Sequence, residues 1–171
     1  MASLSPTVAA PKFLGPQEAC PRRPVYTAEE RARRDSTPWT LVQGVLAPFQ
    51  FLVFLVSLAL VGRFLLTGAG EGPAEISILV KTAVLLLIMV TGAIWEKVVF
   101  GRYLFAPSFF WEDVMSMLVI ALHLAYVVAL LFDVGMPRQQ MWVALAAYAA
   151  YVVNAGQFVW KLRRARQEAR A

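Results

Sequence analysis

The chain of 171 residues contains few of the residues and motifs on which common enzyme chemistries depend. It holds one cysteine, Cys20, and one histidine, His123. One cysteine cannot form a disulfide within the chain, and one histidine is too few for a His-rich metal site. No glycine-rich phosphate loop, HExxH motif or nucleophile elbow is present. The sequence therefore predicts no metal site and no bound cofactor.

Apolar residues are the most abundant class. They make up 59% of the chain, whereas a soluble domain has about 45–50%. The first 38 residues have six prolines and no apolar run, so no cleavable signal peptide is expected. Beyond them, four apolar stretches each reach the roughly 20 residues that a membrane span needs. They run over about Trp39–Leu66, Glu75–Val99, Phe110–Phe132 and Gln139–Leu162. The fold class predicted is all-α, a four-helix transmembrane bundle.

The remaining segments frame this bundle. Residues 1–25 are rich in proline and polar residues and are expected to be a disordered basic tail. Thr27 and Glu30 form a capping-box pattern, which predicts a short arginine-rich helix at about 28–35 within a cytoplasmic or interfacial segment 26–38. A solvated tail with transient helix is an equally good interpretation of that segment. The four-helix domain is expected over 39–166, with a C-terminal tail at 167–171.

Basic residues predict the orientation. They cluster in both tails, and Lys97 and Arg102 flank the middle connection, whereas the other two connections have few. By the positive-inside rule, both termini and the middle connection are cytoplasmic. This distribution favours binding to anionic lipid headgroups of the bilayer, and no nucleic-acid partner is expected. Lys81, within about two turns of the outer end of its span, is expected to extend its amine outward, and we assign it no chemistry.

Polar side chains recur within the predicted spans, where they are costly and usually face the bundle interior. Most of them fall in the predicted cytoplasmic half, as do four of the five tryptophans, so we infer a polar cavity that opens toward the cytoplasm. The polar residues are Gln43, Gln50 and Ser57 in the first span, Thr91, Glu96 and Lys97 in the second, Glu112, Asp113, Ser116 and His123 in the third, and Asn154, Gln157 and Lys161 in the fourth.

Each of these groups also has a purely structural interpretation. Amides and hydroxyls can join helices, at about 0.6 kcal/mol per interaction. The carboxylates can be solvated charges at helix ends. His123, near the bilayer midplane, is either hydrogen-bonded to a neighbouring helix or functional.

Several segments together resemble the 3-vinyl bacteriochlorophyllide hydratase family of bacteriochlorophyll biosynthesis. The resemblance runs from about Tyr26 to Arg166. It is strongest around Trp95-Glu96-Lys97 and Trp111-Glu112-Asp113. The segments that carry it are 26–31, 37–44, 89–101, 105–113 and 151–158.

This resemblance implies a hydro-lyase that adds water across the 3-vinyl group of a chlorophyllide, which carries its own magnesium, in a bacterial inner or intracytoplasmic membrane. A vinyl group on a conjugated ring is hydrated by protonating its terminal carbon, and water then attacks the resulting cation. A partly desolvated carboxyl group can stay protonated and act as the acid. The candidates are Glu96 and Glu112 as acid, Asp113 or His123 as base for water, Asn154 and Gln157 as their partners, Trp95 and Trp111 for stacking, and Arg102 or Lys161 for the propionate.

Alternatives remain at this point. His123 can instead ligate the magnesium of the substrate. The chain can also be a non-catalytic tetrapyrrole carrier or assembly factor, or a structural subunit in which the polar stripes only join helices. Other pigment-biosynthesis enzymes are further candidate partners.

Overall fold

A computed structural model describes residues 24–170, and this part of the chain is helical without strands. Cys20 and residues 1–23 of the predicted tail lie outside it. Four of its helices are long and apolar enough to cross a membrane, which confirms the predicted all-α fold. The helices are α1 (Ala28–Ser36), α2 (Pro38–Thr67), α3 (Glu71–Phe100), α4 (Phe110–Leu131) and α5 (Pro137–Glu168).

Many large apolar side chains of the four long helices, such as Leu41, Leu66 and Leu131, are exposed, as expected for surface that faces lipid. α5 continues six residues beyond the predicted end of its apolar stretch at Leu162. The additional residues are mostly charged and polar. Hydropathy marks where a helix leaves the membrane, whereas hydrogen bonding decides where the helix ends, so the two boundaries differ.

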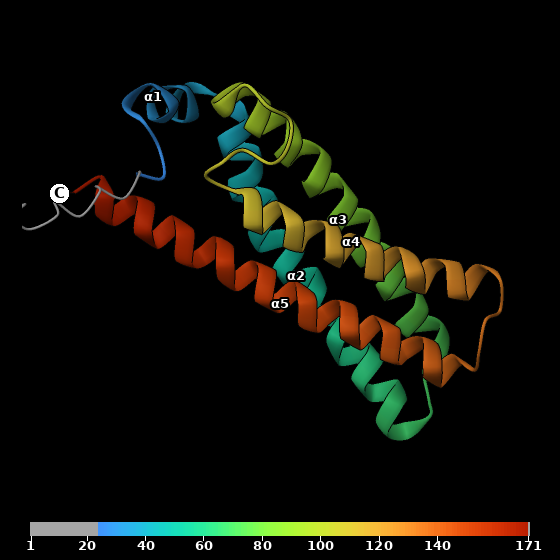
Figure 1. The fold of residues 1–171 in the computed structure, drawn as a ribbon. Helices are drawn as coiled ribbons and strands as arrows, with labels where there is room; N and C mark the ends of the chain where they lie inside the picture. Colours follow the sequence, from blue (N-terminus) through green and yellow to red (C-terminus); the bar gives the residue numbers. More distant parts are fainter. Residues whose placement is uncertain (1–23, 171) are drawn as a thin grey trace, which may run out of the picture.

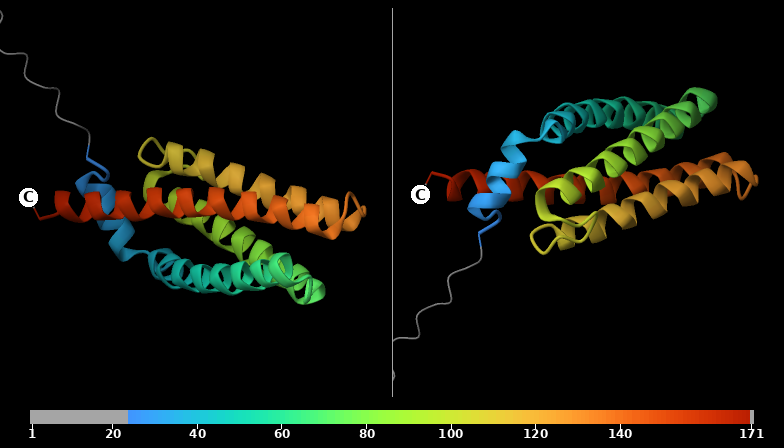
Figure 2. Two further views of the ribbon diagram at one scale, coloured as in Figure 1. Left: turned by 90° about the horizontal axis from the view of Figure 1, so that it is seen from below. Right: turned by 90° about the horizontal axis from the view of Figure 1, so that it is seen from above.

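The helices form two antiparallel hairpins, α2–α3 and α4–α5, each closely packed within itself. Short connections at 68–70 and 132–136 join their helices, and Gly68 ends α2 in the left-handed conformation (φ 72°). Figures 1 and 2 show that the hairpins cross and separate toward these connections. We call this the loop end. The opposite, terminal end holds α1, the connection 101–109 and the end of α5 (Figure 1).

The predicted capping box begins α1. The Thr27 side chain accepts from the Glu30 amide at 3.2 Å, and the Glu30 carboxylate accepts from the Thr27 amide at 2.8 Å. The packed chain begins earlier than predicted, because Val25 is buried and its amide donates to the Glu168 carboxylate at 2.8 Å. Arg33 Nε donates to the Val99 carbonyl oxygen at 2.8 Å, which fixes α1 across the end of α3.

Lys81 does not extend outward as expected. Its side chain is fully buried, and its Nζ lies 3.8 Å from the centroid of the Tyr151 ring. Residue 81 occupies the face of α3 that packs toward the other hairpin, where Tyr151 and His123 lie, so its side chain has no path to the membrane surface. The exposure of the Lys81 side chain therefore depends on which face of α3 it occupies. Its depth in the membrane does not decide it.

Candidate functional site

The connection 101–109 at the terminal end is held by carboxyl groups from two helices. Asp113 Oδ2, at the start of α4, accepts from the Phe105 amide at 2.7 Å. Glu96 Oε2, near the end of α3, accepts from the Ala106 amide at 3.4 Å. Phe105 has a positive φ of 58°, which is uncommon for an aromatic residue, and the bond to Asp113 helps to hold it there. The carboxyl groups of Glu96 and Asp113 therefore hold the backbone of this connection in place.

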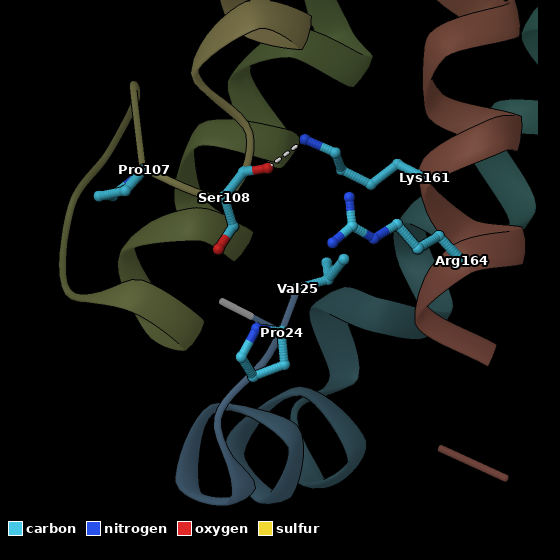
Figure 3. A pocket seen from close by; sticks show the side chains of 6 residues that line it. All are labelled: Pro24, Val25, Pro107, Ser108, Lys161 and Arg164. Atoms are coloured by element: carbon cyan, nitrogen blue, oxygen red, sulfur yellow. Dashed lines mark hydrogen bonds between the residues drawn. The ribbon is translucent and has the colours of Figure 1, made fainter. Parts of the chain in front are cut away.

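A third carboxyl group, that of Glu112, forms an ion pair with Lys161 of α5 at 2.8 Å. The Lys161 amine also donates to the Ser108 carbonyl oxygen of the connection (Figure 3). Lys161 thus joins the ends of α4 and α5 and the connection between α3 and α4.

These acidic side chains are buried together. Glu96, Glu112 and Asp113 each expose 5% or less of their surface, and the carboxyl groups of Glu96 and Asp113 accept from neighbouring amides of the same connection. Glu112 is neutralised by Lys161, and Asp113 accepts a short bond from a backbone amide. Glu96 has only one long bond, so its negative charge is the least compensated. Of the three, Glu96 is best suited to carry a proton, since burial disfavours an uncompensated charge.

Aromatic side chains pack against one another at the same end of the bundle. Trp95 packs edge-on against Phe100 and Phe109, with ring centroids 5.7 and 5.8 Å apart, and its Nε1 donates to Thr40 Oγ1 at 2.9 Å. Tyr26 stacks on Phe100 at 5.7 Å. Burial raises the pKa of Tyr26 to about 12, so its hydroxyl stays protonated at neutral pH. The Trp95 ring therefore packs against other side chains of the protein.

A cavity of about 180 Å³ opens beside the cluster. Figure 3 shows the side chains of Lys161 and Arg164 extending into it from α5 toward Ser108 and Val25. Its lining residues are Pro24, Val25, Pro107, Ser108, Lys161 and Arg164. A larger apolar groove of about 550 Å³ lies between α2 and α3 near the loop end. Its lining includes no ionisable side chain, so it offers no acid for catalysis.

The amides predicted to assist the site lie farther into the bundle. Asn154 Nδ2 donates to Ser116 Oγ at 2.9 Å, and Ser116 lies one turn beyond Glu112 on α4. The Asn154 Oδ1 and Gln157 Oε1 atoms are buried without a hydrogen-bond partner in the part of the chain described. Both amides therefore keep an acceptor for water or ligand.

Three predicted site residues do not join the carboxyl cluster. His123 lies eleven residues beyond Glu112 on α4, about 16 Å along the helix, too far to act on the same water. Its Nδ1 donates to the Val119 carbonyl oxygen at 2.8 Å, and its Nε2 is buried without a partner among the described residues. Arg102 is exposed. Trp111 is 69% exposed on the surface of the bundle, edge-on to Phe110.

The sequence interpretation missed other residues of the site. Arg164 lines the cavity, and Arg34 lies over the Tyr26 ring at 4.8 Å. Both belong to arginine-rich segments that were interpreted only as membrane-binding charge. The spacing of Lys161 and Arg164, three residues apart on one helix, was the available signal, because such residues share a face.

Comparisons with known proteins identify the family of the chain. Residues 26–164 match the family described as 2-vinyl bacteriochlorophyllide hydratase. The protein of that name from Rhodobacter capsulatus is 68% identical over 149 residues, which cover 86% of each chain. The protein of that name from Cereibacter sphaeroides is 65% identical over 154 residues, covering 90% of this chain and 95% of its own. No solved structure matches the chain significantly. The chain therefore belongs to the 2-vinyl bacteriochlorophyllide hydratase family.

Proposed function

We propose that this protein is a hydro-lyase of bacteriochlorophyll synthesis that adds water across the vinyl group of a chlorophyllide-type tetrapyrrole. The locants 2 and 3 denote the same vinyl position in the older and the current numbering of the macrocycle. Membership of the family supports the reaction. The observation that supports its location is the burial of three carboxyl side chains beside an opening at the terminal end.

The proposed chemistry uses Glu96 and Asp113, which bind the adjacent amides of Ala106 and Phe105. Glu96 donates a proton to the terminal carbon of the vinyl group, and the electron pair of the double bond forms the new C–H bond. The cation left on the carbon next to the macrocycle is delocalised over the ring. Water attacks that carbon and loses a proton to Asp113. The proton then returns to Glu96, so each turnover consumes one water and regenerates both carboxyl groups.

Glu112 and Lys161 keep the site organised in this scheme. The ion pair joins α4 to α5, and the bond from Lys161 to Ser108 joins both to the connection 101–109, so together they keep the carboxyl cluster in place. Asn154 and Gln157 can orient water in this scheme, because their amide oxygens are buried without a hydrogen-bond partner among the described residues. General acid–base assistance of this kind is worth about 10²–10⁴-fold in rate.

The macrocycle itself stays outside the cavity in this proposal, since a tetrapyrrole is much larger than 180 Å³, and only substituents at its edge reach in. The rest lies in the membrane interface against exposed aromatic side chains of this end, such as Tyr103, Phe110 and Trp111. Trp111 thus keeps its predicted stacking role, but on the outer surface of the bundle. The magnesium is part of the substrate.

The proposed location is a bacterial inner or intracytoplasmic membrane, with the terminal end in the cytoplasm. The concentration of basic residues in α1 and the end of α5 supports this orientation. Substrate would then enter from the cytoplasmic interface, where other pigment-biosynthesis enzymes can exchange it.

One observation favours a second candidate, a non-catalytic tetrapyrrole carrier. Each of the three carboxyl groups has a structural partner: the Phe105 amide, the Ala106 amide or Lys161. A carrier needs these contacts to hold the connection 101–109 but needs no acid.

Turnover distinguishes the two candidates. Membranes containing the protein are incubated with chlorophyllide a in deuterated water without added cofactor, and the product is analysed by mass spectrometry. A hydratase should give a product heavier by one water, with one non-exchanging deuterium on the new methyl group. Tight pigment binding without conversion, under conditions in which a relative converts the pigment, would establish the carrier instead.

A further inference from the structure

We infer that Arg164 binds the free carboxylate of the substrate's propionate side chain and so selects the acid over its ester. The inference rests on the proposed function, because it assumes that the substrate is a chlorophyllide. A chlorophyllide carries this propionate unesterified. Neither the family nor the relatives' names assign a residue to it.

The cavity beside the carboxyl cluster has the size and chemistry of a carboxylate site. Its volume of about 180 Å³ admits a side chain but excludes the macrocycle. Two cationic side chains, Lys161 and Arg164, extend into it, and its other lining residues are prolines, a valine and a serine. An anionic arm on a larger ring fits such a cavity, because the ring can stay outside in the interface.

Arg164 has hydrogen-bond donors that are not used by the described part of the protein. Its Nε donates to Glu168 at 2.9 Å, and within residues 24–170 its two terminal nitrogens have no hydrogen-bond partner. These nitrogens form a planar fork that matches both oxygens of a carboxylate. The Lys161 amine, by contrast, is already bound to Ser108 and Glu112. We therefore assign the propionate to Arg164, in place of the Lys161 or Arg102 expected from the sequence.

The charges around the cavity also favour an anion. Glu168 balances Arg164, but it also accepts from the Val25 amide and lies near enough to Arg31 to interact with its charge. The ionisable side chains that line the cavity itself are those of Lys161 and Arg164, and both are cationic.

The position of Arg164 explains how a bound propionate would orient the substrate. Arg164 and Lys161 are three residues apart on α5, so their side chains are neighbours on one face of the helix. Lys161 in turn contacts Glu112. A propionate held by Arg164 places the edge of the macrocycle beside the carboxyl cluster, so Arg164 acts as a positioning residue through binding.

The test compares chlorophyllide a with its methyl ester, using the full chain in nanodiscs. We expect the wild-type protein to show a KM about 10- to 100-fold higher for the ester, as expected for losing a hydrogen-bonded charge pair. Arg164→Gln should raise the KM for the acid by the same factor, leave that for the ester unchanged, and change kcat less than about threefold. Arg164→Lys should recover part of the loss.

The matched control is Arg163→Gln, which removes the same charge from an exposed neighbour on the same helix. It should leave both KM values unchanged. If Arg164→Gln still prefers the acid as strongly as the wild type does, or if the wild type does not discriminate, the inference is wrong. If the wild type turns over neither pigment, the proposed function fails, and pigment affinities from tryptophan quenching then test Arg164 with the same variants and the same expected ratios.

Discussion

Replacing Lys161 by methionine should destabilise the protein by leaving Glu112 buried without its partner. At the observed 2.8 Å, the attraction between two unit charges is about 6 kcal/mol at an effective dielectric constant of about 20, and about 1.5 kcal/mol in water. Breaking a buried pair typically costs about 3–5 kcal/mol, because the remaining charge stays desolvated. The Lys161 side chain is 17% exposed, which favours the low end, about 3 kcal/mol.

For a chain of this length, a loss of about 3 kcal/mol lowers Tm by roughly 6–12 °C. Thermal unfolding in detergent, followed by circular dichroism, measures this shift. The double variant Lys161→Met with Glu112→Gln should recover most of the loss, because no uncompensated charge remains. The bond from Lys161 to Ser108 is absent from both variants, so the recovery reports on the ion pair alone.

Arg163→Met is the matched control, since it removes an exposed charge two residues away and should shift Tm by less than about 2 °C. A wild-type Tm for Lys161→Met, or a double variant as unstable as the sum of the single changes, would refute the assignment of a buried ion pair.

Three further predictions concern Lys81 and His123 in the bundle interior and Tyr26 at the terminal end. Lys81→Met should leave Tm unchanged or raise it, because the buried amine has no hydrogen-bond partner among residues 24–170 and lies against the Tyr151 ring; a fall of more than a few degrees in thermal unfolding would reveal a missing partner. His123→Gln should reduce hydration less than threefold in the turnover assay, because His123 lies about 16 Å from Glu112 along α4, whereas a large loss of pigment affinity would favour magnesium ligation. Burial raises the pKa of Tyr26 from 10.0 to about 12, so its contribution to stability is complete below pH 10 and is lost as the pH rises to 12; Tyr26→Phe should lose less stability than wild type across that range, and identical pH profiles would contradict this.

The membrane spans could be predicted from sequence because the bilayer fixes both the length and the polarity of a helix that crosses it. The capping box was also predictable, since Thr27 and Glu30 interact within one turn. The gathering of Glu96, Glu112 and Asp113 followed in outline, because the short connection 101–109 keeps the end of α3 and the start of α4 together.

Contacts between elements could not be predicted in the same way. The bond from Val25 to Glu168 joins residues 143 positions apart, and no local pattern encodes it. Lys81 was placed wrongly because a lysine near a helix end faces lipid or protein depending on how the two hairpins pack. Arg164 was missed because its role depends on a cavity formed by three segments.

The central claim is that the buried carboxyl cluster at the terminal end carries out the hydration. The most direct measurement compares turnover of chlorophyllide a by Glu96→Gln and Glu71→Gln, which make the same chemical change at opposite ends of α3. Glu96→Gln should lose at least about 100-fold in kcat while it still folds and binds pigment, and Glu71→Gln should keep the wild-type rate. A near-normal kcat for Glu96→Gln would contradict the central claim.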